Sequence, residues 1–397
     1  MLSNQGNIIR SIQEFGVVPG NTPAENAASL QKAIDWAAPR GAALFVEPSE
    51  EPYPVAGGVI LRANVSLVGV HGPVGRGTCH PDKPQPVGSV FAITDETLPF
   101  LTVENATQVR GIQFWYPQQT ARDATHIIKY PSTIQVSREK GAQGVTLSCL
   151  TFYGEYLAMN FAASRERICE QILIEHCYGY PLGGTFIRID YCYDIPRILH
   201  CHVNPANRRF IDQGHGPEVV DAVMALQTFC YVIDHTDNAQ LMDVFTFGTW
   251  GGIHLGPATY GQLTNFNLDC VAVGILKQGD NTFNRNWQIA QGSIIANAGA
   301  PLADIHPIII DGSGHTAISN VECFSGQNGA LTTVGQSQDF MLVKGSERLT
   351  VSLMGCRMRN YAASEPITVE NPNAVIQAEV CVDRDENPYR HRPGANK

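Results

Sequence analysis

One short pattern recurs between Gln143 and Ile275: an apolar residue, any residue, then Cys, His or Asp, followed by further apolar residues. Successive copies are spaced by roughly 20–45 residues, a spacing typical of solenoids and propellers. Units this short cannot bury an apolar face alone, so they must stack on one another. When the copies are superposed, their polar position forms a column that comprises Cys149, His176, His200, Asp243, Cys270, Gln291 and Cys323.

A second strand-like run accompanies the first in most copies. These runs are Thr185–Asp190, Phe229–Asp234, Gly252–Leu255, Gly274–Lys277 and Pro307–Asp311. Two or three strands for each turn of chain predict an all-β protein, a right-handed parallel β-helix. A solenoid grows along one axis, so we expect a single domain over residues 1–397 rather than the two or three that length alone would suggest.

Three segments depart from the coil pattern. Thr22-Pro-Ala-Glu25 is a capping box with proline at the first helical position, and it predicts an amphipathic helix over 23–38 that covers the open end of the stack. Residues 204–226 form an insertion, a loop followed by a short helix that Pro217 opens, and long loops on a rigid scaffold often carry function. The polar residues 383–397 are expected to be a loose tail.

Charge and composition exclude some classes of partner. The formal net charge of −10 argues against nucleic acid, whose phosphates require a basic face. No apolar run is long enough to span a membrane. The first residues lack the basic and then apolar order of a signal peptide, so we expect a cytoplasmic protein or a secreted mature form.

The cysteines favour a reduced core over a disulfide framework. Their number, 11, is odd, most of them lie inside strand-like runs, and free cysteine is among the most buried residue types. No Cys-x-x-Cys pair supports a zinc site. We therefore expect reduced thiols stacked in the core at Cys149, Cys177, Cys201, Cys270 and Cys323.

The N-terminal region resembles a known family. The segments that carry the resemblance are Glu14-Phe-Gly, Leu30-Gln-Lys-Ala-Ile-Asp-Trp-Ala37, Leu44-Phe-Val and Tyr53-Pro-Val. They are similar to the opening of pectate-lyase-like, polygalacturonase-related β-helix proteins over about the first seventy residues, and beyond these only the coil pattern agrees. The resemblance implies the pectin-lyase-like solenoid fold and a carbohydrate-active protein, a hydrolase, a lyase or a relative of phage spikes. Members of this family often form homotrimers, and the sequence has no feature that decides the oligomeric state.

Residues at matching positions of neighbouring coils form a ladder, because parallel strands lie ~4.8 Å apart. The second strands thus place Arg188 and Asp190 beside Val232 and Asp234, and then His254. Hydrolysis of a glycosidic bond needs two carboxyl groups, about 5–5.5 Å apart for retention or about 6.5–9.5 Å for inversion. We predict Asp190 and Asp234 as the catalytic pair, with Asp212 and Asp237 in reserve. Sugar binding is predicted for Arg188, Arg209, His215, His254, Lys277 and Trp250.

Structural roles compete with these assignments. Asp190 and Asp234 also suit the ends of strands, where Asp often forms turns. Gly214-His215-Gly216 matches a tripeptide of polygalacturonases, but a glycine-flanked His also suits a plain loop. The column with His176, His200 and Asp243 has metal-binding residue types, yet its apolar neighbours favour interior side chains that are hydrogen-bonded to one another.

Three functions remain open. The first is a glycoside hydrolase that uses paired Asp and no cofactor. The second is a polysaccharide lyase that acts by β-elimination on a uronate-containing glycan, and only this one would use Ca²⁺, for which the sequence has no dense Asp cluster. The third is a non-catalytic module that binds glycans on its outer ladder.

Overall fold

The computed structural model describes residues 9–70, 80, 82–119, 127–208, 217–279, 286–296, 300–323 and 336–391. The chain divides into two compact units. The first comprises Met1–Tyr193 and Cys201–Ala222, and the second comprises Asp194–His200 and Val223–Lys397. Each unit consists almost wholly of parallel strands. The right-handed parallel β-helix that the repeat predicted is confirmed.

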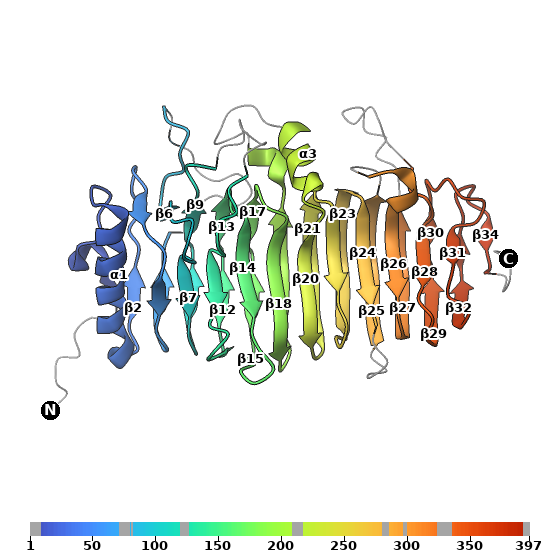
Figure 1. The fold of residues 1–397 in the computed structure, drawn as a ribbon, viewed down its shortest axis with the longest axis horizontal. Coiled ribbons are helices and arrows are strands. Elements are labelled where there is room, and N and C mark those ends of the chain that lie inside the picture. The colour runs from blue at the N-terminus through green and yellow to red at the C-terminus, as the bar shows by residue number, and fades with distance from the viewer. Residues whose placement is uncertain are drawn as a thin grey trace. The chain divides into compact units, whose positions relative to one another are not determined.

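The first unit stacks its coils in three parallel ladders of strands (Figure 1). The first ladder comprises β4 (Val59–Leu61), β7 (Leu101–Val103), β10 (Ile134–Val136), β14 (Leu157–Ala162) and β18 (Thr185–Tyr193). The second comprises β1 (Ile9–Ser11), β2 (Ala43–Phe45), β5 (Ser66–Val68), β8 (Gln108–Arg110), β12 (Thr146–Ser148) and β16 (Leu173–Glu175). The third comprises β3 (Tyr53–Val55), β6 (Val90–Ile93), β9 (Gln113–Trp115), β13 (Thr151–Tyr153) and β17 (Tyr178–Tyr180). Two short strands, β11 (Ala142–Gln143) and β15 (Cys169–Glu170), pair beside the first ladder.

Helix α1 (Pro23–Ala37) packs against β2, β3 and β4, in agreement with the predicted helix 23–38. Its capping box is present, because Thr22 Oγ1 accepts a hydrogen bond from Glu25 N at 3.3 Å while Thr22 N donates to the Glu25 carboxylate at 2.9 Å. Leu30, Ala33 and Ile34 are fully buried at helical spacing. The helix therefore closes the N-terminal end of the first unit's core. Short 3₁₀ turns flank it, η1 (Gln13–Phe15) and η2 (Ala38–Arg40).

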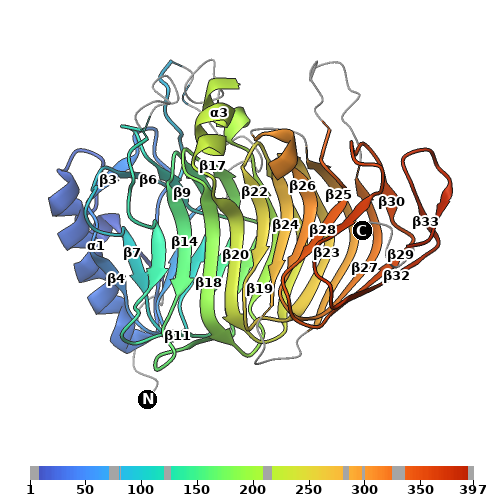
Figure 2. The same ribbon diagram turned by 45° about the vertical axis from the view of Figure 1, so that its right-hand side comes forward.

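The second unit also stacks parallel strands (Figure 2). One ladder comprises β20 (Phe229–Thr236), β22 (Gly251–Leu255), β24 (Val273–Gln278), β26 (His306–Asp311), β28 (Met341–Lys344) and β31 (Ile367–Val369). The other comprises β21 (Ala239–Phe247), β23 (Gly261–Val271), β25 (Asn286–Ala296), β27 (Gly314–Cys323), β29 (Leu349–Met354), β30 (Arg357–Met358), β32 (Ala374–Glu379) and β33 (Cys381–Val382). A 3₁₀ turn, η5 (Leu302–Asp304), precedes β26.

One corner recurs along the second unit as a residue with left-handed backbone. These residues follow the paired positions Met242, Thr264, Ala290, Ser319 and Met354. They are Asp243, Asn265, Gln291, Asn320 and Gly355, with φ angles of 53°, 52°, 56°, 51° and 65°. Asn, Asp and Gly adopt this conformation at the lowest cost, which explains why polar residues and glycine recur there.

The predicted polar column is therefore correct in part. Asp243 and Gln291 occupy the corner, but Cys270 and Cys323 do not, because Asn265 and Asn320 take those places and Cys323 pairs with Ile294. The interior location was wrong as well. The side chains of His200 and Asp243 are 37% and 54% exposed, although they do bond to each other, Nδ1 to Oδ2, at 2.8 Å.

Successive coils place side chains of the same kind on top of one another in the core. In the first unit, the rings of Phe114 and Phe152 are 5.0 Å apart, and Phe152 lies edge-on to Phe186 at 5.6 Å. The predicted core thiols are confirmed for Cys177, Cys201, Cys270 and Cys323, which are buried and reduced, whereas Cys149 is only half-buried.

The inserted segment and the tail are both partly described. Within 204–226 the chain forms a 3₁₀ turn, η4 (Pro205–Arg208), and helix α3 (Pro217–Ala225), which Pro217 opens as predicted. The expectation of a loose tail from Asp383 was wrong as far as His391. Arg384 donates to the carbonyls of Tyr361 and Ala363, and β34 (Pro388–Tyr389) pairs antiparallel with β33. Buried Tyr389 holds this hairpin in place.

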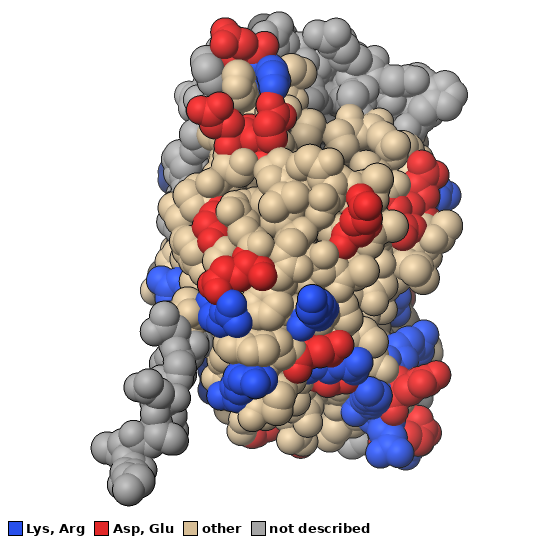
Figure 3. All heavy atoms as spheres, turned by 90° about the vertical axis from the view of Figure 1, so that its left-hand side faces the viewer, with Lys and Arg blue, Asp and Glu red and all other residues tan. Residues whose placement is uncertain are grey.

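The face that α1 helps to form carries charges of both signs (Figure 3). Arg62 lies 3.4 Å from both Asp35 and Glu104, and Arg10 pairs with Glu14. This face therefore has no field of a single sign. None of the helices in the described ranges is both long and apolar enough to cross a membrane.

Candidate functional site

A row of polar side chains runs along the outer face of the first ladder in the first unit. Strand register aligns Thr102 with Gln135, Gln135 with Asn160, and Asn160 with Arg188. Their neighbours within each strand, such as Ile134 and Val136, are buried, so alternation directs the polar residues outward. The row therefore presents hydroxyl, amide and guanidinium groups at successive steps of ~4.8 Å.

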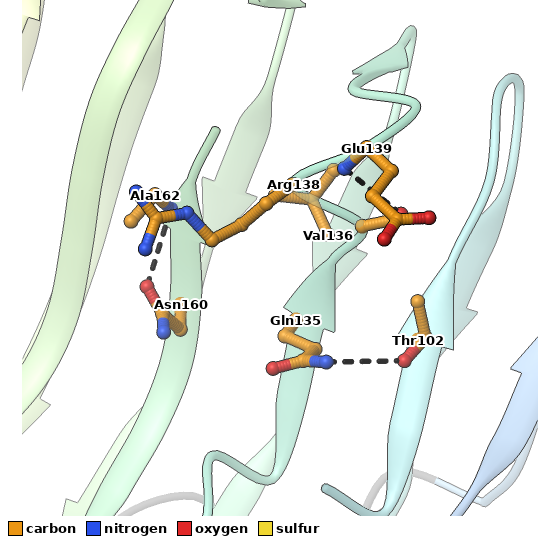
Figure 4. Close-up of a pocket in the computed structure, with 8 residues that line it drawn as sticks. Thr102, Gln135, Val136, Arg138, Glu139, Asn160 and Ala162 are labelled. Carbon is orange, nitrogen blue, oxygen red and sulfur yellow. Dashed lines mark hydrogen bonds between the residues drawn. The ribbon is translucent and has the colours of Figure 1, made fainter. Parts of the chain in front are cut away.

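These side chains border a hollow with a volume of about 350 Å³ (Figure 4). It is lined by Thr102, Gln135, Val136, Ser137, Arg138, Glu139, Asn160 and Ala162. Gln135 Nε2 donates to Thr102 Oγ1 at 3.3 Å, and Asn160 Oδ1 accepts from Ala162 N at 3.2 Å. Figure 4 shows Arg138 reaching across the hollow toward Asn160 and Ala162. Within the described chain, Arg138 has no salt bridge.

An ion pair fixes the turn that carries Arg138. Lys140 Nζ lies 3.0 Å from Glu104 Oε1, and Glu104 also accepts from Ala63 N at 3.3 Å. Burial alone would raise the pKa of Glu104, yet these contacts hold it below its ordinary value. Glu104 thus links the turn that carries Arg138 to the segment after β7.

The predicted residues Arg188 and Asp190 adjoin this hollow. Both lie on β18 and are spaced by two residues, and they pair in register with Asn160 and Ala162. Arg188 is exposed and Asp190 is half-buried, so both lie on the outer face as predicted. Ala162, the register partner of Asp190, lines the hollow.

The predicted residues of the second unit lie on the outer face of its ladder β20 to β31. Val232, His254 and Leu276 align in register, as the sequence predicted. Asp234 follows Ile233, which pairs with Leu255, so its carboxylate lies beside Gly256, and a Cβ there would be 1.6 Å from Asp234 Oδ1. His254 Nε2 lies 2.9 Å from Gln278 Oε1. Gln278 in turn aligns with Asp311, which faces Lys344 at 3.8 Å.

Trp250 belongs to an apolar cluster next to His254. The ring of Phe229 lies edge-on to Trp250, with centroids 5.5 Å apart, and is tilted against His254, with centroids 5.4 Å apart. Val273 and Leu276 continue the cluster. Half-buried aromatic rings beside polar groups can hold the apolar face of a ring-shaped ligand. The sugar-binding role of Trp250 stays a prediction.

Lys277 does not lie on the outer face, and its predicted role was wrong. It is 2% exposed, and it aligns with Leu255 and Ile310, which point into the core. Its Nζ donates to the carbonyl of Ser313 at 2.5 Å. Two consecutive strand residues cannot face the same side, and Leu276 takes the outward place.

The remaining predicted residues do not form one described site. Asp190 belongs to the first unit and Asp234 to the second, so the catalytic pair stays a prediction. Asp237 lies just beyond β20, where its Oδ1 is buried without a hydrogen-bond partner in the described residues. Arg209, Asp212 and His215 lie outside the described residues. The described ranges hold no group of three or more His, Cys, Asp or Glu arranged for a metal ion.

Sequence reasoning missed the hollow's own residues. Thr102, Gln135 and Asn160 lie on strands too short to give a repeat signal, and Arg138 lies in a turn. The available signal was the alternation in Ile134-Gln-Val and Met159-Asn-Phe, where one polar residue separates two buried ones.

Comparisons with known proteins agree with the fold described above. The fold is that of the pectin-lyase-like parallel β-helix proteins, as the N-terminal resemblance predicted. No protein-family model matches the chain, and no curated protein matches its sequence. Among solved structures, DFA-IIIase from Arthrobacter chlorophenolicus A6 in complex with GF2 is similar, with 13% identity, a TM-score of 0.59, and coverage of 98% of this chain and 100% of that one. A mutant of the same enzyme in complex with DFA-III has 12% identity, a TM-score of 0.58 and 96% coverage of both chains.

Proposed function

We propose that this protein is a carbohydrate-active enzyme, a glycoside hydrolase that binds an oligosaccharide or polysaccharide along the outer faces of its ladders. The observation that carries the proposal is the outward row Thr102, Gln135 and Asn160 beside a hollow, with Arg188 and Asp190 at its edge. Amides and hydroxyls both donate and accept hydrogen bonds, as sugar hydroxyls require. A row with a repeat of ~4.8 Å offers such groups along an extended chain.

The proposed chemistry is acid and base catalysis by paired carboxyl groups, with Asp190 of the first unit and Asp234 of the second as the candidates. One carboxyl group protonates the oxygen of the departing sugar, while the other activates water or attacks the anomeric carbon. Arg188 would orient the sugar through its guanidinium group.

The solved structures of the same fold support the choice of ligands to test. DFA-IIIase has been described in complexes with GF2 and with DFA-III. At 12–13% identity this likeness concerns the fold, so these two compounds enter as the first members of a broader glycan panel.

The test compares Asp190→Asn, Asp234→Asn and the unaltered protein on that panel, with Asp82→Asn as a control on the exposed surface. We expect new reducing ends without ultraviolet absorbance from the unaltered protein and from the control, and a loss of at least roughly 10²-fold in each of the other variants. Full activity in both Asn variants would remove the proposed pair.

A polysaccharide lyase is the second candidate, and a specific observation favours it. Arg138 reaches over the hollow and Arg188 adjoins it, so two guanidinium groups are available for a uronate carboxylate. In the same assay, an unsaturated product that absorbs ultraviolet light would identify the lyase. Binding without any product would leave a glycan-binding module.

A further inference from the structure

Two cysteines of the second unit face each other on its last two coils. Arg357 pairs with Val382, so the preceding residues, Cys356 and Cys381, lie side by side on parallel strands. Each is 1% exposed. Adjacent strands lie ~4.8 Å apart, inside the window of about 4.4–6.8 Å between Cα atoms that a disulfide requires. The backbone thus already holds the two residues at bonding distance.

The corner conformation aims both thiols inward. Cys356 follows Gly355 and Cys381 follows Val380, whose φ angles are 65° and 55°. Cys356 Sγ lies 3.7 Å from the Met354 carbonyl, and Cys381 Sγ lies 3.3 Å from the Glu379 carbonyl. Cys356 Sγ also lies 3.8 Å from the Ile318 carbonyl. Their sulfur atoms therefore share one site in the core.

The first unit contains a matched pair in an interior coil. Tyr178 pairs with His202, which places Cys177 beside Cys201, and these thiols are likewise buried and hydrogen-bonded. Cys177 Sγ lies 3.4 Å from the Glu175 carbonyl, as in the terminal pair. The two pairs share chemistry and register, so they differ chiefly in position along the stack.

That position makes the terminal pair easier to reach. Cys381 pairs on its outer side with Tyr389 of β34, a strand of two residues. The neighbouring Val380 is 84% exposed, and Val375 on β32 is 49% exposed. Two-residue strands at the end of a stack open locally at far lower cost than interior coils. Small solutes can therefore reach Cys381 without unfolding of the whole protein.

We propose that Cys356 and Cys381 are an oxidation site that forms a disulfide with a small peroxide as oxidant, whereas Cys177 and Cys201 stay reduced. The hydrogen bond from Cys356 lowers the pKa of Cys381 to about 7, which supports Cys381 as the attacking thiolate.

The reaction balances in two steps. The Cys381 thiolate attacks one oxygen of hydrogen peroxide, the O–O bond breaks, and Cys381 becomes a sulfenic acid as hydroxide leaves and takes up a proton to give water. Cys356 sulfur then attacks Cys381 sulfur, the S–O bond breaks, and the proton of Cys356 leaves with the hydroxyl group as a second water. Two thiols are oxidised to one disulfide, and one peroxide is reduced to two waters.

The experiment treats the folded full chain with hydrogen peroxide, in a background with Cys79→Ser and Cys149→Ser that removes two thiols outside the pairs. Remaining thiols are alkylated, and non-reducing peptide mass spectrometry follows the products. We expect a linked peptide pair that contains Cys356 and Cys381, lighter by two hydrogen atoms, and fully alkylated Cys177 and Cys201. Reduction with dithiothreitol followed by a second alkylation should convert the linked pair into the two alkylated peptides.

Two variants serve as matched controls. Cys381→Ser should abolish the linked species, whereas Cys201→Ser should leave it unchanged, and thermal melting checks that both variants fold. The proposal is overturned if the linked peptide is absent from the unaltered pair, or if Cys177 and Cys201 link at the same rate. The first measurement needs no variant of either pair, so a misfolded variant cannot hide the answer.

Discussion

The carboxylate of Asp234 occupies the space in which a side chain at Gly256 would lie. A Cβ at Gly256 would be 1.6 Å from Asp234 Oδ1 and 3.3 Å from the Ile233 carbonyl. Glycine at this rung thus lets the carboxylate lean over the neighbouring strand of the second unit. The placement of the Asp234 carboxylate, a predicted catalytic group, therefore depends on the absence of a side chain at Gly256.

We expect Gly256→Ala to lower glycosidase activity by at least roughly tenfold, since small displacements of a catalytic group are costly. The obstacle is the tip of one side chain, which can rotate away, so the melting temperature should change little. Activity on the most active glycan and a melting curve test this pair of outcomes. Gly20→Ala is the control, because a Cβ there meets nothing within 4 Å. Unchanged activity in Gly256→Ala would argue against a catalytic Asp234.

Arg138 offers a test of the hollow in the first unit. Arg138→Ala removes the guanidinium group that reaches toward Asn160, and we expect roughly tenfold weaker glycan binding, equivalent to about 1.4 kcal/mol. Titration calorimetry with the best ligand of the panel measures the change. Arg110→Ala serves as the matched control, because Arg110 is exposed on β8 in a different ladder. Equal affinities in the two variants would place the ligand elsewhere.

Lys277→Met should affect stability but not ligand binding. Met fills the space of the lysine stem, yet it removes the hydrogen bond to the Ser313 carbonyl, at a cost of about 1–3 kcal/mol. Urea unfolding should show this loss, while glycan affinity stays constant. Lys32→Met on the exposed face of α1 should change neither quantity. A large loss of affinity in Lys277→Met would restore the sugar-binding role that burial contradicts.

Replacement of Asp269 is expected to increase stability in a pH-dependent way. Burial raises the pKa of this carboxyl group, and its Oδ1 has no hydrogen-bond partner among the described residues. A raised pKa in the folded state means that folding favours the protonated form, so stability falls as pH rises above the unfolded value of about 3.9. Asp269→Asn should raise the melting temperature at pH 7, and the gain should vanish at and below pH ~3.5.

The control for this prediction is Asp82→Asn, an exposed carboxylate whose replacement should shift the melting temperature equally at both pH values. If Asp269→Asn were less stable than the unaltered protein at pH 7, the ionised carboxylate would instead have a stabilising partner.

The fold was predictable because coils repeat their apolar residues in register. The alignment of Val232, His254 and Leu276 came from the sequence alone and holds in the structure. The corner residues were harder to predict from the sequence. Asn265 and Asn320 share the left-handed φ angle of Asp243, but they are not the same residue type. Residue type therefore located the coils but misplaced Cys270 and Cys323.

The site was less predictable than the fold. The sequence indicated Arg188, Asp190, Asp234 and His254 on outer faces, and the structure places them there. The prediction for Lys277 was wrong, because Leu276 faces outward and the next residue of a strand must then face the core. The hollow near Arg138 depends on how a turn folds over three strands, and no spacing along the chain records that.

The left-handed corners of the second unit have a consequence for how such a protein can change over generations. Each corner residue marks a fixed point in its coil, so added residues lengthen only the connection where they enter and leave the rungs aligned. Loops of new length and chemistry can then be acquired one at a time on an unchanged frame. Selection can thus exchange specificity without rebuilding the scaffold.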